Sequence, residues 1–486
     1  MSACKKCLLI VMLALGWLIP THTPTATHAQ FSPSYAEIDC PEDIPLESGV
    51  RCGMLEVLEN RANPAGRTIQ LPIYTLPSFT DTPAPDPVVF LAGGPGQDAS
   101  IFAYYTDSFT PFRFSRDVII LEQRGTLLAD PALMCPEYGV TIAEGYLSDL
   151  PVQEAVQPAA DALLQCRADY QAQGIDTNAY TSTENAADLE DLRTTMGYEQ
   201  WNLYGASYGT NLALIVMRDH PDGLRSVIIE SVNPTTINFF PDTPVNVANA
   251  LYGSFAICAA DPDCAADYPD PEAALFEVVD RLNETPLEVT TRDLPQNIFL
   301  NGRAYLFVLF NTLYQTYYLH ELPRIIYDNL NGDFGEISAI AQPYLYSWGE
   351  FATVMHYTIQ CTERLAYDTL DEFEAASDSL DPRLADMTDM DNFVTWAICQ
   401  GMEGLYLNPA DNEPVVSDVP TLLISGQYDP VTPPVNGDVA LETLSRGQHF
   451  VIPNAAHTPS FANPCARQMM AEFVDAPEAE VVMLCD

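Results

Sequence analysis

The stretch Trp201-Asn202-Leu203-Tyr204-Gly205-Ala206-Ser207-Tyr208-Gly209 is the most informative part of the chain for its fold. Its last five residues match the pattern Gly-x-Ser-x-Gly, in which a serine occupies a sharp turn between a strand and a helix. A strand-like run precedes the turn, and residues 210–217 after it have helical character. The glycines suit a turn too tight for larger side chains, and the following helix points its N-terminus toward the serine. We therefore predict that Ser207 is a nucleophile.

Short apolar runs on both sides of this turn predict a mostly parallel sheet. They occupy residues 88–92, 117–121, 201–204, 225–229, 420–424 and 449–452. Such continuous apolar runs are typical of strands that are buried on both faces. Helical stretches separate several of them, which favours an α/β fold with helices on both faces of the sheet. Alternating apolar residues at 53–59 and 68–74 predict two further strands near the start.

A long helical segment interrupts the predicted sheet between residues 232 and 420. Its helical spacing carries many aromatic side chains, namely Tyr305, Phe307, Phe310, Tyr314, Tyr317 and Tyr318. We interpret the segment as a helical cap that is inserted after the sixth strand and covers the active site, with most of these rings in its own core. The expected organisation is a signal peptide (1–29), a first core part (30–235), the cap (236–415) and a second core part (416–486).

A nucleophilic serine needs a base and an acid, which in this type of fold follow it in the order acid, then histidine. His457 lies in a loop beyond the last predicted strand and is the predicted base, whereas His449 opens that strand and is the alternative. Asp429 follows the preceding strand and is the predicted acid, which would orient the imidazole. Glu230, at the end of an earlier strand, is the alternative acid.

The glycine-rich loop 93–96 follows the apolar run 88–92 and suits an oxyanion hole. Such a hole uses the backbone N–H of the residue after the nucleophile and an N–H from the loop after an early strand. We predict Tyr208 and Gly94 in these roles, because Pro95 has no N–H. A phosphate-binding loop is the rival interpretation, but the chain lacks the Gly-Lys-Ser/Thr motif that it requires.

Four ordered motifs together resemble the prolyl aminopeptidase and tripeptidyl aminopeptidase family of α/β-hydrolases. They are Ala92-Gly93-Gly94-Pro95-Gly96, Glu122-Gln123-Arg124-Gly125-Thr126, Gly205-Ala206-Ser207-Tyr208-Gly209, and the late Asp429 and His457. The resemblance covers about residues 88–235 and 415–465 and implies the α/β-hydrolase fold. Ala92 stands where many prolyl aminopeptidases have histidine, which favours the tripeptidyl type. Thr126-Leu127-Leu128 replaces the second glycine that usually follows the Arg-Gly pair.

The same resemblance implies a serine exopeptidase that removes residues or short peptides from free N-termini. Such an enzyme needs a carboxylate for the α-ammonium group of the substrate, and the candidates are Glu363, Glu122 and Glu230. A structural role is an open alternative for each of them. A carboxylesterase or lipase with the same triad is the alternative function, and a non-catalytic binding protein on this fold is a third.

The first residues are typical of a secretory signal peptide. Lys5 and Lys6 precede an apolar run from 7 to 20, and Ala29 supplies the small residue of a cleavage site. The run is shorter than the ~20 apolar residues that span a bilayer. We therefore expect a secreted protein, extracellular or periplasmic, without stable membrane association after signal removal.

The charge is strongly acidic, with 67 Asp and Glu against 20 Lys and Arg. The only lysines are those of the predicted signal peptide, and removing residues 1–29 takes the net charge from −47 to −49. A mature chain without lysine excludes a Ser-Lys dyad and a pyridoxal Schiff base. The acidity excludes nucleic acid as a partner, because it repels phosphate. We expect peptide substrates and no cofactor.

Twelve cysteines are present, and two of them, Cys4 and Cys7, fall in the predicted signal peptide. The remaining ten are an even number in a chain expected to be exported, which indicates disulfides. Sequence proximity suggests the pairs Cys40–Cys52, Cys135–Cys166, Cys258–Cys264, Cys361–Cys399 and Cys465–Cys485. A zinc site is the alternative, but no CxxC pair or HExxH helix occurs, so no metal site is predicted.

Overall fold

The computed structural model describes residues 31–41, 49–237, 239–291 and 297–485, so the predicted signal peptide lies outside the described residues. A nine-stranded sheet runs through it in the order β1-β2-β3-β5-β4-β6-β7-β10-β11. Its strands are β1 (Ser34–Ile38), β2 (Arg51–Leu58), β3 (Thr68–Leu76), β4 (Val88–Leu91), β5 (Val118–Leu121), β6 (Trp201–Ala206), β7 (Leu224–Glu230), β10 (Thr421–Gly426) and β11 (Gly447–Ile452).

The strands from β5 to β11 in this order pair in parallel, and the pairs among β1, β2, β3 and β5 are antiparallel. The predicted mostly parallel sheet is therefore confirmed. The sequence analysis missed β1, an exposed edge strand without a clear apolar pattern. Because of β1, the inserted helices follow the seventh strand of the chain and not the sixth.

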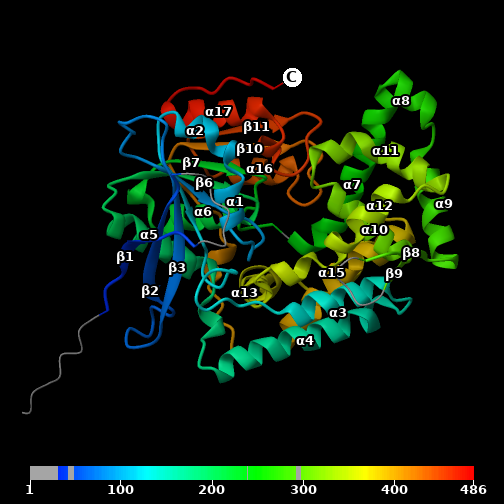
Figure 1. Ribbon diagram of the computed structural model, residues 1–486, viewed down its shortest axis with the longest axis horizontal. Helices are drawn as coiled ribbons and strands as arrows, with labels where there is room; N and C mark the ends of the chain where they lie inside the picture. Colours follow the sequence, from blue (N-terminus) through cyan, green and yellow to red (C-terminus); the bar gives the residue numbers. More distant parts are fainter. Residues whose placement is uncertain (1–30, 42–48, 238, 292–296, 486) are drawn as a thin grey trace, which may run out of the picture.

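Helices cover both faces of the sheet (Figure 1). α5 (Ser182–Met196) packs on α6 (Tyr208–Asp219), which packs on β6 and β7. The helices α1 (Ser100–Tyr104), α2 (Thr110–Arg113) and α17 (Pro464–Asp475) lie against the other face, and α16 (Pro434–Leu441) packs on β10 and β11. Strand β4 shows why its run is continuously apolar: Val89 and Leu91 enter one core, and Val88 and Phe90 enter the other.

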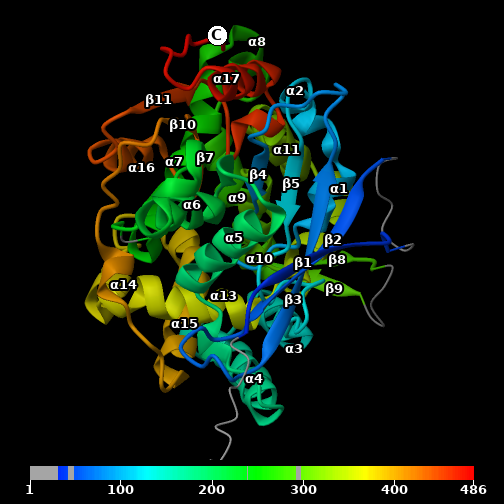
Figure 2. The ribbon, with the colours of Figure 1, turned by 90° about the vertical axis from the view of Figure 1, so that its left-hand side faces the viewer.

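A large helical layer lies between β7 and β10 along the chain. It contains α7 (Phe239–Ala260), α8 (Pro262–Asp267), α9 (Pro271–Glu284), α10 (Gly302–Thr312), α11 (Thr316–Leu330), α12 (Gly335–Leu345), α13 (Thr353–Ile359), α14 (Leu370–Ala375), α15 (Pro382–Gly401) and the hairpin β8 (Leu287–Val289) and β9 (Ile298–Leu300). Two earlier helices join this layer (Figure 2): α4 (Val152–Ala172) packs on α15, and α3 (Pro136–Leu147) packs on α4 and α10. The helical layer is thus larger than the insertion itself.

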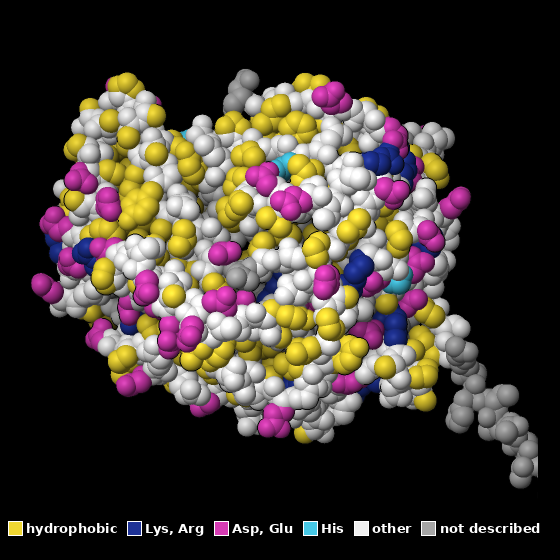
Figure 3. All heavy atoms as spheres, turned by 180° about the vertical axis from the view of Figure 1, so that it is seen from behind, with side chains coloured by type: hydrophobic (Ala, Val, Ile, Leu, Met, Phe, Trp, Pro, Cys, Tyr) yellow, Lys and Arg dark blue, Asp and Glu magenta, His cyan; other side chains and the backbone are white. Residues whose placement is uncertain are grey.

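All five cysteine pairs suggested by sequence proximity are bonded in the structure. They tie together segments that are close in sequence, in the sheet region and in the helical layer alike. No helix in the described ranges combines the length and the apolar character needed to cross a membrane. Acidic side chains are spread over the face shown in Figure 3, whereas Lys and Arg side chains are few.

Candidate active site

Ser207 lies between the last residue of β6 and the first residue of α6, at the turn that the Gly-x-Ser-x-Gly pattern predicts. Its φ of 56° and ψ of −126° place it in a strained region that a serine adopts only when its surroundings enforce it. A Cβ on Gly209 would lie 2.1 Å from the oxygen of Leu91, and one on Gly205 would lie 2.3 Å from the oxygen of Gly209. Both positions therefore require glycine.

His457 and Asp429 form a hydrogen-bonded pair. The Nδ1 atom of His457 lies 2.7 Å from Oδ2 of Asp429, and both side chains are buried. Ser231 also donates its hydroxyl to Oδ2 at 2.7 Å, and the Oγ1 of Thr432 donates to it at 2.8 Å. The other oxygen, Oδ1, accepts the backbone N–H groups of Val431 and Thr432. The carboxylate is thus held from several sides.

These contacts keep Asp429 ionised. Burial by itself would raise the pKa of Asp429, but the neighbouring imidazole of His457 and the backbone N–H donors bring the pKa below its usual value. An ionised acid that accepts from Nδ1–H leaves Nε2 of His457 as the basic nitrogen. This is the protonation pattern that a catalytic histidine needs.

The two alternatives from the sequence analysis lie in different settings. Glu230 accepts hydrogen bonds from the hydroxyl of Tyr204 and from the backbone N–H of Ser460, at 2.5 and 2.6 Å, and burial raises its pKa. His449 hydrogen-bonds to Asp438 and Ser425 through its two ring nitrogens. Neither side chain lines the cavity that contains Ser207.

The loop after β4 reaches Ser207. A Cβ on Gly93 would lie 3.0 Å from Cβ of Ser207, so this loop packs directly against the serine. Gly94 and Tyr208, the two residues predicted to form the oxyanion hole, both line the same cavity as Ser207. Gln123 supports the loop by donating from Nε2 to the oxygen of Ala92 at 2.9 Å.

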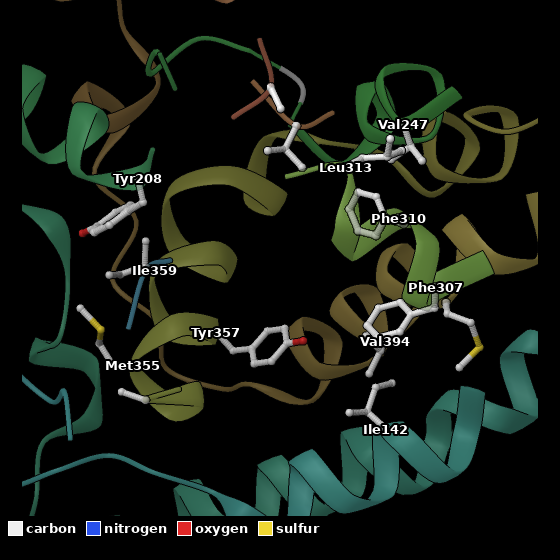
Figure 4. Packing of buried hydrophobic residues seen from close by; sticks show 14 of the residues in the cluster. Ile142, Tyr208, Val247, Phe307, Phe310, Leu313, Met355, Tyr357, Ile359 and Val394 are labelled. Atoms are coloured by element: carbon white, nitrogen blue, oxygen red, sulfur yellow. The ribbon is translucent and has the colours of Figure 1, made fainter. Parts of the chain in front are cut away.

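The cavity has a volume of about 550 Å³, and Ser207 and His457 both face it. The helical layer contributes nine aromatic side chains to its wall, namely Phe239, Phe240, Phe307, Phe310, Tyr314, Tyr344, Trp348, Phe351 and Tyr357. Figure 4 shows Tyr357 of α13 with its hydroxyl directed toward Phe307 of α10. The ring of Tyr314 meets the ring of His457 edge-on, with centroids 5.2 Å apart.

The expectation that most of these aromatics form the cap's own core is therefore only partly right. Tyr305 is fully buried away from the cavity, and Tyr317 is exposed. Phe307, Phe310 and Tyr314, by contrast, line the cavity. Helical periodicity identifies the buried face of a helix, but it does not reveal whether that face meets other side chains or an open cavity.

The carboxylates predicted to bind the substrate amine do not line the cavity. Both oxygens of Glu363 accept from Ser182, its N–H at 2.7 Å and its hydroxyl at 2.6 Å, behind Tyr208. Glu122 accepts the N–H of Ser100 at 2.6 Å and the hydroxyl of Thr126 at 2.7 Å. The hydrogen bonds of Glu363 and Glu122 join elements around the site. Like Glu230, both carboxylates are therefore bonded within the protein and lie outside the cavity wall.

Asp391 of α15 is the one carboxylate among the described residues of the cavity wall. The hydroxyl of Tyr146 donates to its Oδ1 at 3.0 Å, and burial raises its pKa to about 6. The adjacent Asn392 also lines the cavity, and its amide nitrogen has no partner within the described part of the chain. The sequence analysis missed both residues, because nothing distinguishes Asp391 among 67 acidic residues.

Within the described ranges, only Cys135, Glu137 and Cys166 cluster in the way that metal ligands do. Cys135 and Cys166 are bonded to each other, which removes their thiolates as ligands. This cluster is therefore unsuited to a metal.

Comparison with protein families matches residues 86–464 to the alpha/beta hydrolase fold. The chain is 25% identical over 205 residues to tripeptidyl aminopeptidases of Streptomyces coelicolor and Streptomyces lividans, which is 40% of this chain and 38% of each relative. It thus spans less than two fifths of the length of these curated relatives. A solved proline iminopeptidase of Mycobacterium smegmatis is 16% identical with a TM-score of 0.37, over 84% of this chain and 95% of its own.

Proposed function

The chain belongs to the α/β-hydrolase fold family, and on this premise we propose that it is a serine hydrolase with Ser207, His457 and Asp429 as its catalytic triad. The observation that carries the proposal is the strained turn at Ser207 in the same cavity as a His457 that is hydrogen-bonded to Asp429. Backbone strain at a serine on a cavity wall is typical of a functional site.

The arrangement supports acyl transfer in two steps. The Oγ of Ser207 attacks the substrate carbonyl carbon while Nε2 of His457 takes its proton, and the same proton then passes to the departing amine. Water hydrolyses the acyl-enzyme by the reverse path. Asp429 stays ionised throughout and stabilises the imidazolium form of His457.

In the tetrahedral intermediate the substrate oxygen carries negative charge. The backbone N–H groups of Gly94 and Tyr208 are our candidates to stabilise it, since both residues line the cavity at Ser207. The N-terminus of α6 adds a favourable dipole at the same place. One donor of this kind contributes on the order of 10²–10³ in kcat in other serine hydrolases.

For the substrate class, we propose peptides with a free α-amine, from which the enzyme releases residues or short peptides. The matched relatives are tripeptidyl aminopeptidases. Asp391 lies on the wall of a cavity with many aromatic side chains and forms no ion pair with a described residue, so an ammonium group of the substrate would supply its missing cation. The amide nitrogen of Asn392, which has no partner among the described residues, is our candidate donor to a peptide carbonyl.

We further propose that residues 236–415 act as a cap that shapes the substrate site, and that the protein is exported. The cap role is supported by the many cavity residues that this segment supplies. Export is supported by the five disulfides, which persist in oxidising compartments.

A substrate panel tests the proposal. Purified protein is assayed with peptide anilides of one to four residues, each with a free and an acetylated N-terminus, beside simple aryl esters. We expect kcat/KM to be at least 100-fold higher for the free than for the acetylated form. Equal rates on both forms would contradict the aminopeptidase activity. Turnover of the esters alone would favour the carboxylesterase alternative, and no turnover at all would contradict a hydrolase.

A further inference from the structure

A segment of the helical layer, residues 351–356, contacts the glycine-rich loop at consecutive positions. The N–H of Ala352 donates to the oxygen of Gly96 at 3.0 Å. The ring of Phe351 lies 3.4 Å from where a Cβ of Gly94 would be. His356 places Nδ1 2.9 Å from the oxygen of Pro95. The loop next to Ser207 is thus in contact with the helical layer as well as with the sheet.

The hydrogen bond from His356 has a defined direction. Because the carbonyl of Pro95 can only accept, Nδ1 of His356 carries the proton and Nε2 is an acceptor. The amide nitrogen of Gln360 lies 3.5 Å from Nε2, on the side where a donor is needed. Burial lowers the pKa of His356 to about 4, so the ring is neutral near pH 7. Trp348 packs edge-on against the ring, with centroids 5.1 Å apart.

Among the described residues, side-chain hydrogen bonds from the sheet side reach the two ends of this loop. Gln123 donates to the oxygen of Ala92 before the glycines, and Glu122 accepts the N–H groups of Ala99 and Ser100 after them. The middle of the loop, Pro95 and Gly96, is hydrogen-bonded to the helical layer through His356 and Ala352. Gly94 directly precedes this middle part.

We propose that His356 is a positioning residue, which holds the Pro95 carbonyl and thereby keeps the Gly94 N–H directed at the substrate oxyanion. The inference rests on the proposed function, because it needs Gly94 in the oxyanion hole. The helical layer would then help to stabilise the oxyanion, in addition to binding substrate. An oxyanion hole works only when its donors are held in place before the charge develops.

Two substitutions of His356, whose new side chains are similar in shape, test the hydrogen bond to the Pro95 carbonyl. His356→Asn retains a donor near the position of Nδ1, whereas His356→Leu has a similar outline without one. We expect His356→Leu to lower kcat about 100-fold, the scale of one oxyanion-hole donor, with KM changed less than threefold. His356→Asn should recover kcat to within about tenfold of wild type.

A transition-state analogue separates positioning from a purely structural role. A peptide trifluoromethyl ketone forms an oxyanion on Ser207, whereas the released peptide product does not. We expect the inhibition constant of the ketone to weaken in proportion to the loss of kcat in His356→Leu, with that of the product unchanged. Equal losses for ketone, product and KM would make His356 a substrate contact and would overturn the proposal.

Two further variants complete the experiment. His449→Leu removes another histidine with two hydrogen bonds, outside the cavity, and should lower Tm without changing kcat or ketone affinity. Ala352→Pro removes the N–H donor to Gly96 at a φ of −72° that proline adopts, and should lower kcat about tenfold even if His356→Leu does not fold. Wild-type kcat in both His356→Leu and Ala352→Pro would overturn the proposal. A wild-type protein that cleaves no substrate would instead overturn the proposed function.

Discussion

The sheet side and the helical side of the site differ in how a buried carboxylate is hydrogen-bonded. On the sheet side, Asp429 accepts hydrogen bonds at both oxygens and has a lowered pKa. On the helical side, Asp391 accepts one hydrogen bond from Tyr146, and burial raises its pKa to about 6. Asp429 has hydrogen-bond donors at both oxygens within the protein, whereas Asp391 has no cationic partner among the described residues. On this difference rests our proposal that the sheet side performs the chemistry and the helical side selects the substrate.

The strongest test of the sheet side is Ser207→Ala. Loss of the nucleophile should lower kcat on the order of 10⁶-fold, because the acyl-enzyme of the proposed mechanism forms on the Oγ of Ser207. Steady-state assays with a free-amine peptide anilide measure the effect. Ser254→Ala removes a buried hydroxyl that donates to Leu319 at 2.6 Å, away from the cavity, and should keep wild-type kcat. More than a tenth of wild-type activity in Ser207→Ala would refute the assignment.

The next effect compares two buried carboxylates at strand ends. Asp429→Asn should lower kcat by about 10⁴-fold, because an amide stabilises the wrong tautomer of His457. Glu230→Gln keeps the shape and an acceptor for the N–H of Ser460, so kcat should stay within tenfold of wild type. The two variants are assayed side by side with thermal unfolding as a folding control. The reverse order of losses would make Glu230 the catalytic acid.

On the helical side, Asp391→Asn should act on free-amine substrates alone. We expect kcat/KM to fall about 100-fold for the free peptide, with the acetylated peptide changed less than threefold, since only the ammonium needs the charge. Asp389→Asn, on the same helix but outside the cavity wall, is the matched control and should leave the ratio of the two kcat/KM values unchanged. An equal loss on both peptides would place Asp391 in a structural role.

The ratio of kcat/KM for the free peptide to kcat/KM for the acetylated peptide should depend on pH. Below about pH 6, Asp391 of the free enzyme becomes protonated and the preference for the free amine should decrease. Above about pH 8, the α-amine of the substrate loses its proton and the preference should decrease again. Taking the ratio removes effects of His457 that both substrates share. Asp391→Asn should flatten the acidic side of this profile.

The smallest effect concerns stability and Glu363. Burial, and then the nearby Asp411, raise the pKa of Glu363 to about 7, so the folded state favours the protonated carboxyl. The stability that protonated Glu363 gives the folded state is fully present below about pH 4.5 and is lost as the pH rises to 7. Glu363→Gln keeps the contacts to Ser182 without the charge and should raise Tm by a few degrees at pH 8 relative to wild type.

That gain in Tm should disappear at pH 5, where wild-type Glu363 is protonated when folded. Glu374→Gln, an exposed change on α14, should leave Tm unaltered at both pH values. If Glu363→Gln removed the preference in kcat/KM for the free over the acetylated peptide, Glu363 would be the amine-binding residue. A lower Tm at pH 8 would show that the carboxyl is ionised and stabilising.

The sequence predicts the sheet side far better than the helical side, for a physical reason. Parallel strands buried on both faces need continuous apolar runs, and the turn at Ser207 tolerates only glycine at positions 205 and 209. Such constraints are local and leave a pattern in the chain. The sequence does not predict the edge strand β1, because an exposed strand needs no continuous apolar run.

The helical side is set by contacts between distant segments. Asp391, Asn392 and His356 come to the cavity from α15 and α13, and α3 and α4 join the same layer from far earlier in the chain. Amphipathic spacing predicts these helices but not their mutual arrangement. Glu363, chosen from its place near the end of the cap, instead accepts hydrogen bonds from Ser182.

The most direct test of the central claim is active-site labelling followed by peptide mapping. Native protein is treated with a fluorophosphonate, with and without prior addition of a free-amine or an acetylated peptide. We predict one adduct per chain, on the peptide containing Ser207, with protection by the free-amine peptide and little by the acetylated one. An adduct on another residue would contradict the sheet-side chemistry, and equal protection by both peptides would contradict substrate selection by the helical side.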